Sequence, residues 1–497
     1  MAGRRDGRDD RGRGRRDFDR RNNQGKRHDK GWVPRREQSD KARLVAYDVL
    51  RMVADDDAYA NLVLPREIRR ARLNKLDAAY ATNLCYGTLR LRGRWDAIIS
   101  RCTQGRTLED IDPELLDILR LGCQQLLGFN TPVHAAINET VKLARNELGQ
   151  GAGGFVNAIL RRVSERTDDW EDVIRSSTAS ETEFLSVWFS HPRWVVEALA
   201  ESLQANGRSA DELAQLLEAD NAPAKVALVA RGISAETLRE KIEAAHMESS
   251  ESALMPNAVL LDSGDPHRLW AVQDGEAGVQ DEGSQLIAAV TAGAPIAGSD
   301  ELWLDMCAGP GGKTATLAAI ATERGARIHA NEPQPHRLDL VADAVEPWAD
   351  IVGLREGDGR ELGTEEAEQY DRVLVDAPCT GLGALRRRPE ARWRKKASDV
   401  EDLTKLQSEL LAAGFDALRE GGVLVYSTCS PVVAETRDIV TRFLESRPQA
   451  ELVDAAPIAT SQAKREVTSV GRMIQLWPDR DDTDAMFIAV IQKKTKG

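Results

Sequence analysis

Two cysteines, Cys379 and Cys429, lie in short motifs that could support nucleophilic chemistry. The chain reads DAPCTGLG at 376–383 and YSTCSP at 426–431, and each motif follows a predicted strand. A single cysteine is usually a small packed side chain. Two cysteines after adjacent strands, each flanked by Pro and by Ser or Thr, indicate a reactive pair instead. The residue types and spacing leave open which of the two attacks.

A thiolate is suited to one difficult methylation. Carbon 5 of cytosine is a poor nucleophile, but addition of a thiolate to carbon 6 makes an enamine-like intermediate that can attack an electrophilic methyl group. Asp376 begins the first motif, where it could hold or protonate ring nitrogen 3 as charge develops. A base must then remove the proton from carbon 5 before the thiol can leave. These residues therefore predict covalent catalysis.

A glycine-rich turn precedes these motifs and predicts a ligand site. The sequence DMCAGPGGKT occupies 305–314, and its glycines permit a tight turn that brings a ligand close to backbone amides at a helix start. A phosphate-binding P-loop would require a glycine at Cys307, and the dinucleotide fingerprint GxGxxG would require one at Thr314. The turn therefore matches neither of these two motifs.

Two carboxylates follow the next predicted strands and indicate what the ligand is. Glu332 lies about 20 residues beyond the glycines, where a carboxylate can accept both hydroxyl hydrogens of a ribose. Asp358 follows the third strand and could accept a hydrogen bond from an adenine amino group. Each alone is typical of a solvated loop acid. Placed at successive strand ends after a glycine turn, they predict an adenosine-type ligand.

Apolar runs that alternate with helical segments predict the sheet that positions these motifs. Such alternation is typical of a parallel, doubly wound sheet, whose ligands lie beyond the carboxyl ends of the strands. The predicted strands are Leu302–Met306, Ala326–Ala330, Ile351–Leu354, Val373–Val375, Val423–Tyr426 and Phe487–Ile491. Residues 271–497 are therefore predicted to form one Rossmann-like α/β domain.

The first half of the chain predicts two further domains behind an N-terminal arm. Residues 1–40 are mostly Arg, Asp and Gly, which cannot bury enough apolar surface to order themselves. Apolar residues recur with helical periodicity over 41–170, which predicts an all-α bundle with a helix start at Asp112–Pro113. Short apolar runs around the helical stretch Ser234–His246 predict a small α/β linker domain over 171–270.

Composition and charge exclude several classes of protein. No apolar run reaches the roughly 18 residues of a membrane span, and the N-terminus lacks the apolar core of a secretory signal, so a cytoplasmic protein is expected. Six scattered cysteines without a CxxC pair fit a reducing compartment and predict no metal site. The net charge is −13, but residues 1–37 carry fourteen Lys and Arg against seven Asp and Glu. Any nucleic-acid surface must therefore be local.

A basic segment follows the Cys379 motif and predicts such a surface. Residues 386–396 read RRRPEARWRKK, with seven Arg and Lys and one Glu. Arginines close to a reacting cysteine can hold phosphates beside the target base, and a tryptophan can stack on a base. The candidate RNA contacts are Arg386, Arg387, Arg388, Arg392 and Trp393.

At these motifs the chain resembles the NOL1/NOP2/Sun family of S-adenosylmethionine-dependent RNA cytosine-C5 methyltransferases, and within it the bacterial Sun/Fmu (RsmB-type) enzymes of 16S rRNA. The resemblance spans about 41–497 and includes VQDEGSQ at 279–285. It implies that Cys429 attacks and that Cys379 assists release. It also implies that the helical bundle is a NusB-like RNA-binding domain.

The resemblance further implies a binding site for S-adenosyl-L-methionine. The implied cofactor residues are Cys307, Ala308, Gly309, Pro310, Gly311, Gly312, Lys313, Glu332, Arg337, Asp358 and Asp376. The chain departs from the family pattern at Ala434-Glu435-Thr436, where an acidic pair and Asn are usual, and at Asp484-Ala485-Met486-Phe487, where Asp-Gly-Phe-Phe is usual. Neither departure removes a reacting group.

We therefore expect an enzyme that forms 5-methylcytosine in 16S rRNA through a covalent cysteine adduct, with free rRNA or a small-subunit assembly intermediate as its partner. The alternatives are the same chemistry on another rRNA or tRNA cytosine, a P-loop nucleotidase, and a non-catalytic NusB-like RNA-binding factor. Cys307 weighs against the nucleotidase because a P-loop has glycine there. The joint presence of the two cysteines and Asp376 weighs against a factor without catalytic activity.

Overall fold

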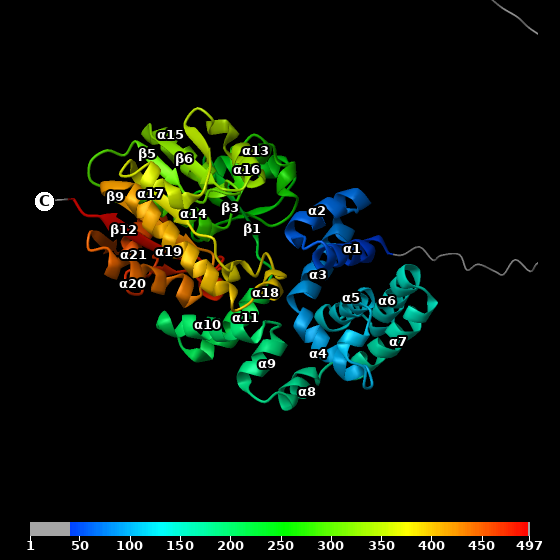
Figure 1. Ribbon diagram of the computed structural model, residues 1–497. Coiled ribbons are helices and arrows are strands. Elements are labelled where there is room, and N and C mark those ends of the chain that lie inside the picture. Colours follow the sequence, from blue (N-terminus) through cyan, green and yellow to red (C-terminus); the bar gives the residue numbers. More distant parts are fainter. Residues whose placement is uncertain (1–39, 496–497) are drawn as a thin grey trace, which may run out of the picture. The chain divides into compact units, whose positions relative to one another are not determined.

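The computed structural model describes residues 40–495 (Figure 1). The arm predicted for residues 1–40 lies outside this range except for Asp40, whose side chain accepts a hydrogen bond from the backbone N–H of Arg43. Within the described range, no helix is both long and apolar enough to cross a bilayer. All six cysteines are free thiols.

Helices alone fill the first part of the described chain, in agreement with its apolar periodicity. The predicted helix start at Asp112–Pro113 is confirmed, because Pro113 is the first residue of a helix. The helices are α1 (Lys41–Asp55), α2 (Ala60–Ala71), α3 (Lys75–Arg90), α4 (Arg92–Cys102), α5 (Pro113–Cys123), α6 (Val133–Leu148), α7 (Gln150–Ser164), α8 (Trp170–Ser177), α9 (Glu181–Trp188), α10 (Arg193–Ala205) and α11 (Leu213–Asn221).

The helical region extends further than the sequence predicted. Helices α8 to α11 occupy the first half of the predicted α/β linker domain at 171–270. Their apolar side chains, among them Ile174, Leu199 and Leu216, belong to the same buried core as those of α1 to α7. The helical region therefore continues as far as the short connection between α11 and the first strand.

A small antiparallel sheet follows the helices. Its strands pair in the order β2 (Ser249–Glu251), β3 (Ala258–Leu261), β1 (Val226–Ala230) and β4 (Ala277–Val279), with helices α12 (Ala235–Ala244) and α13 (Trp270–Gln273). Strand β4 lies beyond the predicted end of the linker domain at residue 270. Only two residues separate β4 from the next helix, so the small sheet leads directly into the last domain.

A larger sheet carries the predicted motifs. Its order is β10 (Ala450–Val453), β12 (Phe487–Lys493), β9 (Leu418–Thr428), β8 (Tyr370–Asp376), β5 (Leu302–Asp305), β6 (Arg327–Glu332) and β7 (Val352–Glu356), and β11 (Ile474–Gln475) pairs with β12. Strands β5 to β9 run parallel, as predicted. The prediction of a wholly parallel sheet is wrong for β12, which pairs antiparallel with β9 and with β10.

Helices cover both faces of this sheet and give it the predicted Rossmann-like form. They are α14 (Glu282–Gly293), α15 (Gly312–Arg324), α16 (Pro335–Val345), α17 (Leu362–Glu365), α19 (Asp399–Ala417), α20 (Arg437–Ser446) and α21 (Ala455–Gln462). Two short helices, α18 (Ala391–Arg394) and α22 (Pro478–Asp481), lie instead at the helical region. Successive strand residues point to opposite faces. In β8, Leu374 therefore packs in a core with α14 and α15, whereas Val373 and Val375 pack in a second core with α19 and α20.

The turns that follow β8 and β9 also pack against the helical region. Leu382 and Leu385, after β8, and Val432, after β9, belong to the buried core of the helical region, together with Trp477 near the C-terminus. The segments that carry the two reactive motifs are therefore held from both sides, by the strands before them and by the helices against which they pack.

Candidate active site

The structure brings the two candidate cysteines into contact. Strands β8 and β9 are parallel neighbours, with Asp376 paired to Ser427 at their carboxyl ends. Cys379 and Cys429 follow these strands, and their sulfur atoms lie 3.4 Å apart. Both residues are partly exposed. The sequence placed the two cysteines after adjacent strands of the sheet, and the structure agrees.

The thiol pair is polarised. The hydrogen bond with Cys379 lowers the pKa of Cys429 below that of an ordinary thiol, and this effect outweighs burial and the neighbouring carboxylates. The same hydrogen bond, together with burial, raises the pKa of Cys379 well above the ordinary value. These opposite directions favour Cys429 over Cys379 as the thiol that ionises first, as a nucleophile requires.

A lysine from the glycine turn reaches the reacting residues. Lys313 donates a hydrogen bond from Nζ to Asp376 Oδ2 at 2.8 Å, and Ser427 donates from Oγ to Asp376 Oδ1 at 3.0 Å. Burial lowers the pKa of Lys313, but the ion pair with Asp376 outweighs burial and raises it. The positive charge of Lys313 also helps to lower the pKa of Cys429. Both oxygens of Asp376 are thus oriented.

The glycine turn forms a cradle that only glycine permits. A Cβ atom on Gly309 would lie 2.2 Å from Glu332 Oε2, and Gly311 has φ +101°, a left-handed conformation that L side chains rarely adopt. Glu332 is nearly fully buried and pairs with Arg337, which also donates to the carbonyl oxygen of Gly309 at 2.6 Å. This buried carboxylate beside bare backbone fits the ribose of an adenosine-type ligand.

A second acid lies behind the turn. Asp305 ends β5 and accepts a hydrogen bond from Thr314 Oγ1 at 2.7 Å, whereas its buried Oδ1 lacks a hydrogen-bond partner among the described residues. Burial raises the pKa of Asp305 to about 7. An unsatisfied buried oxygen at this point fits a site that is completed by a ligand or by water.

The remaining predicted cofactor residues are also found around this turn. Cys307, Ala308 and Pro310 connect β5 to α15, and Gly312 is the first residue of α15. The position of Asp358 is different, because its carboxylate is paired with Arg360 and partly exposed. Hydrogen bonds from Arg360 lower the pKa of Asp358. An adenine contact by Asp358 would compete with this ion pair.

The structure corrects part of the prediction for the basic segment. Arg392 is fully buried and donates to the carbonyl oxygen of Ser190 at 3.1 Å and to Asn221 Oδ1 at 2.8 Å. Arg386 is also buried and pairs with Asp482. These two guanidinium groups are bonded within the protein and are not available to phosphate, because the segment is packed between the helical region and the sheet domain.

Arg387 is likewise bonded within the protein. It donates to Asp281 Oδ1 at 2.8 Å and to Asp484 Oδ1 at 3.1 Å, so it joins two segments that the family resemblance singled out. Arg388 alone of the three consecutive arginines is exposed. Its guanidinium lies over the ring of Tyr59 at 5.3 Å. Trp393 is partly exposed and lies next to Arg92, at 5.8 Å.

One residue of the site was present in the sequence without a role assigned to it. Glu435 is fully buried and accepts hydrogen bonds from the backbone N–H of Thr380 and from the Ser430 hydroxyl, the residues that directly follow the two cysteines. The signal in the sequence was the family pattern at 434–436, in which Glu435 is the one acid kept from the usual acidic pair.

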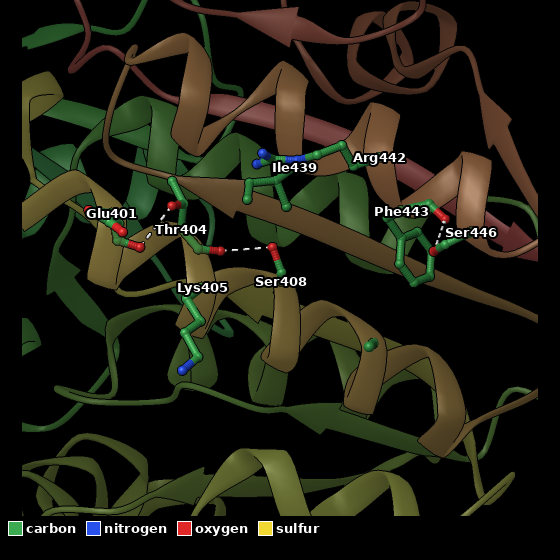
Figure 2. Close-up of a pocket in the computed structure, with 9 residues that line it drawn as sticks. Glu401, Thr404, Lys405, Ser408, Ile439, Arg442, Phe443 and Ser446 are labelled. Carbon is green, nitrogen blue, oxygen red and sulfur yellow. Dashed lines mark hydrogen bonds between the residues drawn. The ribbon is translucent and has the colours of Figure 1, made fainter.

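Two cavities lie elsewhere. Figure 2 shows one of about 420 Å³ between α19 and α20, lined by Thr404, Lys405, Arg442 and Phe443 among others. The second, of about 690 Å³, is lined by residues of the helical region such as Trp188. Neither is lined by the cysteines, so the candidate site is defined by its side chains and not by the volume of a cavity.

Comparison with known proteins gives a consistent result. The family model described as 16S rRNA methyltransferase RsmB/F matches residues 296–492, and the NusB family model matches residues 40–165. A putative methyltransferase of Mycobacterium tuberculosis (strain ATCC 25618 / H37Rv) is 44% identical, over 93% of this chain and 98% of its own length. The probable ribosomal RNA small subunit methyltransferase B of Bacillus subtilis (strain 168) is 31% identical, over 91% and 98%. The chain belongs to the 16S rRNA methyltransferase RsmB/F family.

Solved structures agree with this fold. The crystal structure of PH0851 superposes with a TM-score of 0.75 at 22% identity, over 91% of this chain and 98% of that chain. NSun6 from Pyrococcus horikoshii with SFG gives 0.52 at 19% identity, over 61% and 99%. The predicted family resemblance is confirmed. This RsmB/F-family protein is an S-adenosylmethionine-dependent methyltransferase with a NusB-like helical region and a Rossmann-like domain.

Proposed function

We propose that this methyltransferase forms 5-methylcytosine in small-subunit rRNA, in the cytoplasm, through a covalent bond between Cys429 and carbon 6 of the target cytosine. The observation that carries the proposal is the thiol pair, in which Cys379 lies 3.4 Å from Cys429 and lowers its pKa. A thiolate beside an oriented carboxylate is the arrangement that addition to a cytosine ring requires.

The first step makes carbon 5 reactive. The Cys429 thiolate forms a bond to carbon 6, and the electron pair of the C5–C6 double bond becomes available at carbon 5. Asp376, fixed by Lys313 and Ser427, is placed to hold ring nitrogen 3 as charge develops on the ring. The glycine cradle and Glu332 would hold S-adenosylmethionine, which would supply the electrophilic methyl group to carbon 5, with the S–CH3 bond broken and its electron pair left on sulfur.

The second step restores the ring. A base takes the proton from carbon 5, the released electron pair re-forms the C5–C6 double bond, and the bond to Cys429 breaks to return its thiolate. Cys379 is suited to be that base, because its pKa is raised mainly by the hydrogen bond with Cys429 and also by the Cys429 charge. Both effects disappear once Cys429 is bonded to carbon 6, so Cys379 then gives its own proton to water more readily, and the resulting thiolate accepts the proton from carbon 5.

An exposed arginine and the name of a relative both support an RNA substrate. The exposed Arg388 follows the Cys379 turn and offers a phosphate contact, and Trp393 offers a ring for stacking. The Bacillus subtilis relative carries the name of a small-subunit rRNA methyltransferase. Because cytosine within a helix hides carbon 6, the target base must be unstacked or flipped out. The substrate is 16S rRNA, free or in an assembly intermediate.

Bisulfite sequencing of rRNA tests the proposal. A strain that lacks the gene should lose the 5-methylcytosine signal at a single small-subunit rRNA position, and the wild-type gene should restore it. The Cys429→Ala gene should not restore it. Sequencing tRNA and large-subunit rRNA from the same strains tests the alternative substrates. Unchanged signals at every position in all these RNAs would reject the proposed activity.

A further inference from the structure

Glu435 is the most fully bonded buried carboxylate next to the thiol pair. It ends a short helical turn, Val433–Glu435, and has no exposed surface. Its carboxylate accepts from Thr380 N at 2.8 Å, Thr380 Oγ1 at 2.5 Å, Ser430 Oγ at 2.6 Å and Gln407 Nε2 at 3.1 Å. One carboxylate thus gathers donors from three separate segments.

Those segments are the two cysteine turns and the helix beside them. Thr380 directly follows Cys379, and Ser430 directly follows Cys429. Gln407, on α19, also donates to the carbonyl oxygen of Pro378 at 2.8 Å, so the first turn is held at two points. The two hydroxyls of Thr380 and Ser430 lie 3.0 Å apart at the same carboxylate oxygen.

Glu435 is itself fixed. The Tyr426 hydroxyl, on β9, donates to the carbonyl oxygen of Glu435 at 2.8 Å. The backbone N–H of Glu435 donates to the carbonyl oxygen of Val432 at 3.0 Å, and Val432 is anchored in the helical core. The carboxylate is therefore a rigid point to which both cysteine turns are tied.

We propose that Glu435 is a positioning residue that holds the two cysteine turns together and thereby determines which thiol is the nucleophile. Its role in catalysis rests on the proposed function, but its effect on the thiols does not. Because Glu435 bonds the residues beside the cysteines and not the sulfur atoms, it acts through Thr380 and Ser430.

The negative charge of Glu435, like its hydrogen bonds to the two turns, favours Cys429 over Cys379 as the nucleophile. After the hydrogen bond with Cys429 and burial, the nearby Glu435 carboxylate is among the causes that raise the pKa of Cys379. It therefore helps to keep the proton on Cys379. Loss of the carboxylate would both loosen the sulfur–sulfur contact and remove a charge that opposes ionisation of Cys379.

The test compares the reactivity of the two thiols in the purified full chain without RNA. Glu435→Gln keeps the size of the side chain but removes the charge and one acceptor oxygen. Iodoacetamide is added for a short time at pH 7, and mass spectrometry measures the rate of alkylation at each cysteine. In the wild type, Cys429 should react faster than Cys379. In Glu435→Gln the ratio of the two rates should fall at least about threefold, which corresponds to half a pKa unit.

Asp371→Asn is the matched control. Asp371 is also a buried carboxylate with several donors, including Leu302 N at 2.8 Å and Ser299 Oγ at 2.7 Å, but it lies near the opposite end of β8. Its substitution should lower the melting temperature and leave the ratio of the cysteine rates unchanged. A general loosening of the fold would change the ratio in both variants and would overturn the proposal.

A second variant covers the case in which Glu435→Gln does not fold. Ser430→Ala removes only the bond on the Cys429 side, and the ratio should fall in the same direction by a smaller factor. An unchanged ratio in a folded Glu435→Gln or in Ser430→Ala would overturn the positioning role. Failure of the proposed RNA methylation is recognised separately, because the alkylation assay contains no RNA and does not depend on turnover.

Discussion

Lys313 donates a hydrogen bond to Asp376 across 2.8 Å and so joins the glycine cradle to the thiol pair. Lys313 is the second residue of α15, and Asp376 is the last residue of β8. The residues proposed to hold the cofactor and those proposed to react are thus parts of one bonded network. This network makes specific predictions.

The roles of the two cysteines predict different trapped species. If Cys429 attacks carbon 6, Cys429→Ala should neither methylate RNA nor form a covalent complex. Cys379→Ala should still attack and transfer methyl, and it should then stall, because the thiol that clears the carbon 5 proton is missing. A denaturing gel with labelled RNA should show a resistant complex for Cys379→Ala and none for Cys429→Ala or the double variant. Accumulation of the complex in Cys429→Ala would reverse the roles.

The buried Glu332 predicts a loss of cofactor affinity. Glu332→Ala removes the acceptor for the ribose hydroxyls and should weaken binding of S-adenosylmethionine by about 1–3 kcal/mol, measured by calorimetry. Glu356 lies opposite Glu332 on the neighbouring strand β7, but Glu356 is exposed. Glu356→Ala is therefore the control and should bind the cofactor normally. Equal affinities in the two variants would reject the assignment of Glu332.

The buried Arg392 and the exposed Arg388 of the basic segment are expected to affect different properties, stability and RNA binding respectively. Arg392→Met leaves buried acceptors at Ser190 and Asn221 without a partner and should lower the free energy of unfolding by at least about 2 kcal/mol. Arg388→Ala should change stability by less than about 0.5 kcal/mol. The exposed variant should instead weaken RNA binding and reduce the slope of log affinity against log salt by about 1. Denaturant titration and RNA binding at several salt concentrations check both. RNA binding by Arg388→Ala at the wild-type affinity and slope would exclude it from the RNA surface.

The lowered pKa of Cys429 predicts the pH dependence of its alkylation. A lowered pKa means that the thiolate persists to lower pH than in an ordinary thiol and is lost as the pH falls through the pKa of the folded protein. Lys313 is one of the charges that lower it, so Lys313→Met should move the midpoint of the alkylation rate to higher pH. Lys405→Met, at an exposed lysine on α19, is the control and should leave the midpoint in place. Coincident profiles for the wild type and Lys313→Met would contradict the assigned electrostatics.

The sequence predicted that the two cysteine motifs would follow neighbouring strands, and they lie together because parallel strands end at one edge. Cys379, Cys429 and Glu332 each follow or end an apolar run, and that position alone places them on the same side of the sheet. The glycine cradle was also predictable, because closely spaced glycines after a strand indicate that a ligand approaches the backbone there. What the sequence could not show was the bond between Lys313 and Asp376, because 63 residues separate them.

Burial of the basic segment could not be predicted from its composition. Arg392 is bonded to Ser190 and Asn221, which lie far away in the sequence. The sequence alone does not distinguish an arginine that contacts phosphate from one that contacts buried carbonyl groups. Helices α8 and α9 were missed for another reason. Each has only eight residues, too few for helical periodicity to be distinguished from a short apolar strand.

The packing of Leu382 and Leu385 into the helical core has a consequence for the order of synthesis. The ribosome completes the last helix of that core, α11, roughly 160 residues before it reaches Leu382. At about 5–20 residues per second, the helical region emerges on the order of ten to thirty seconds before the side chains that fill its surface. During that interval an apolar face of the nascent chain is open to water and to chaperones. The packing of the helical region is therefore completed only when the catalytic turns reach it.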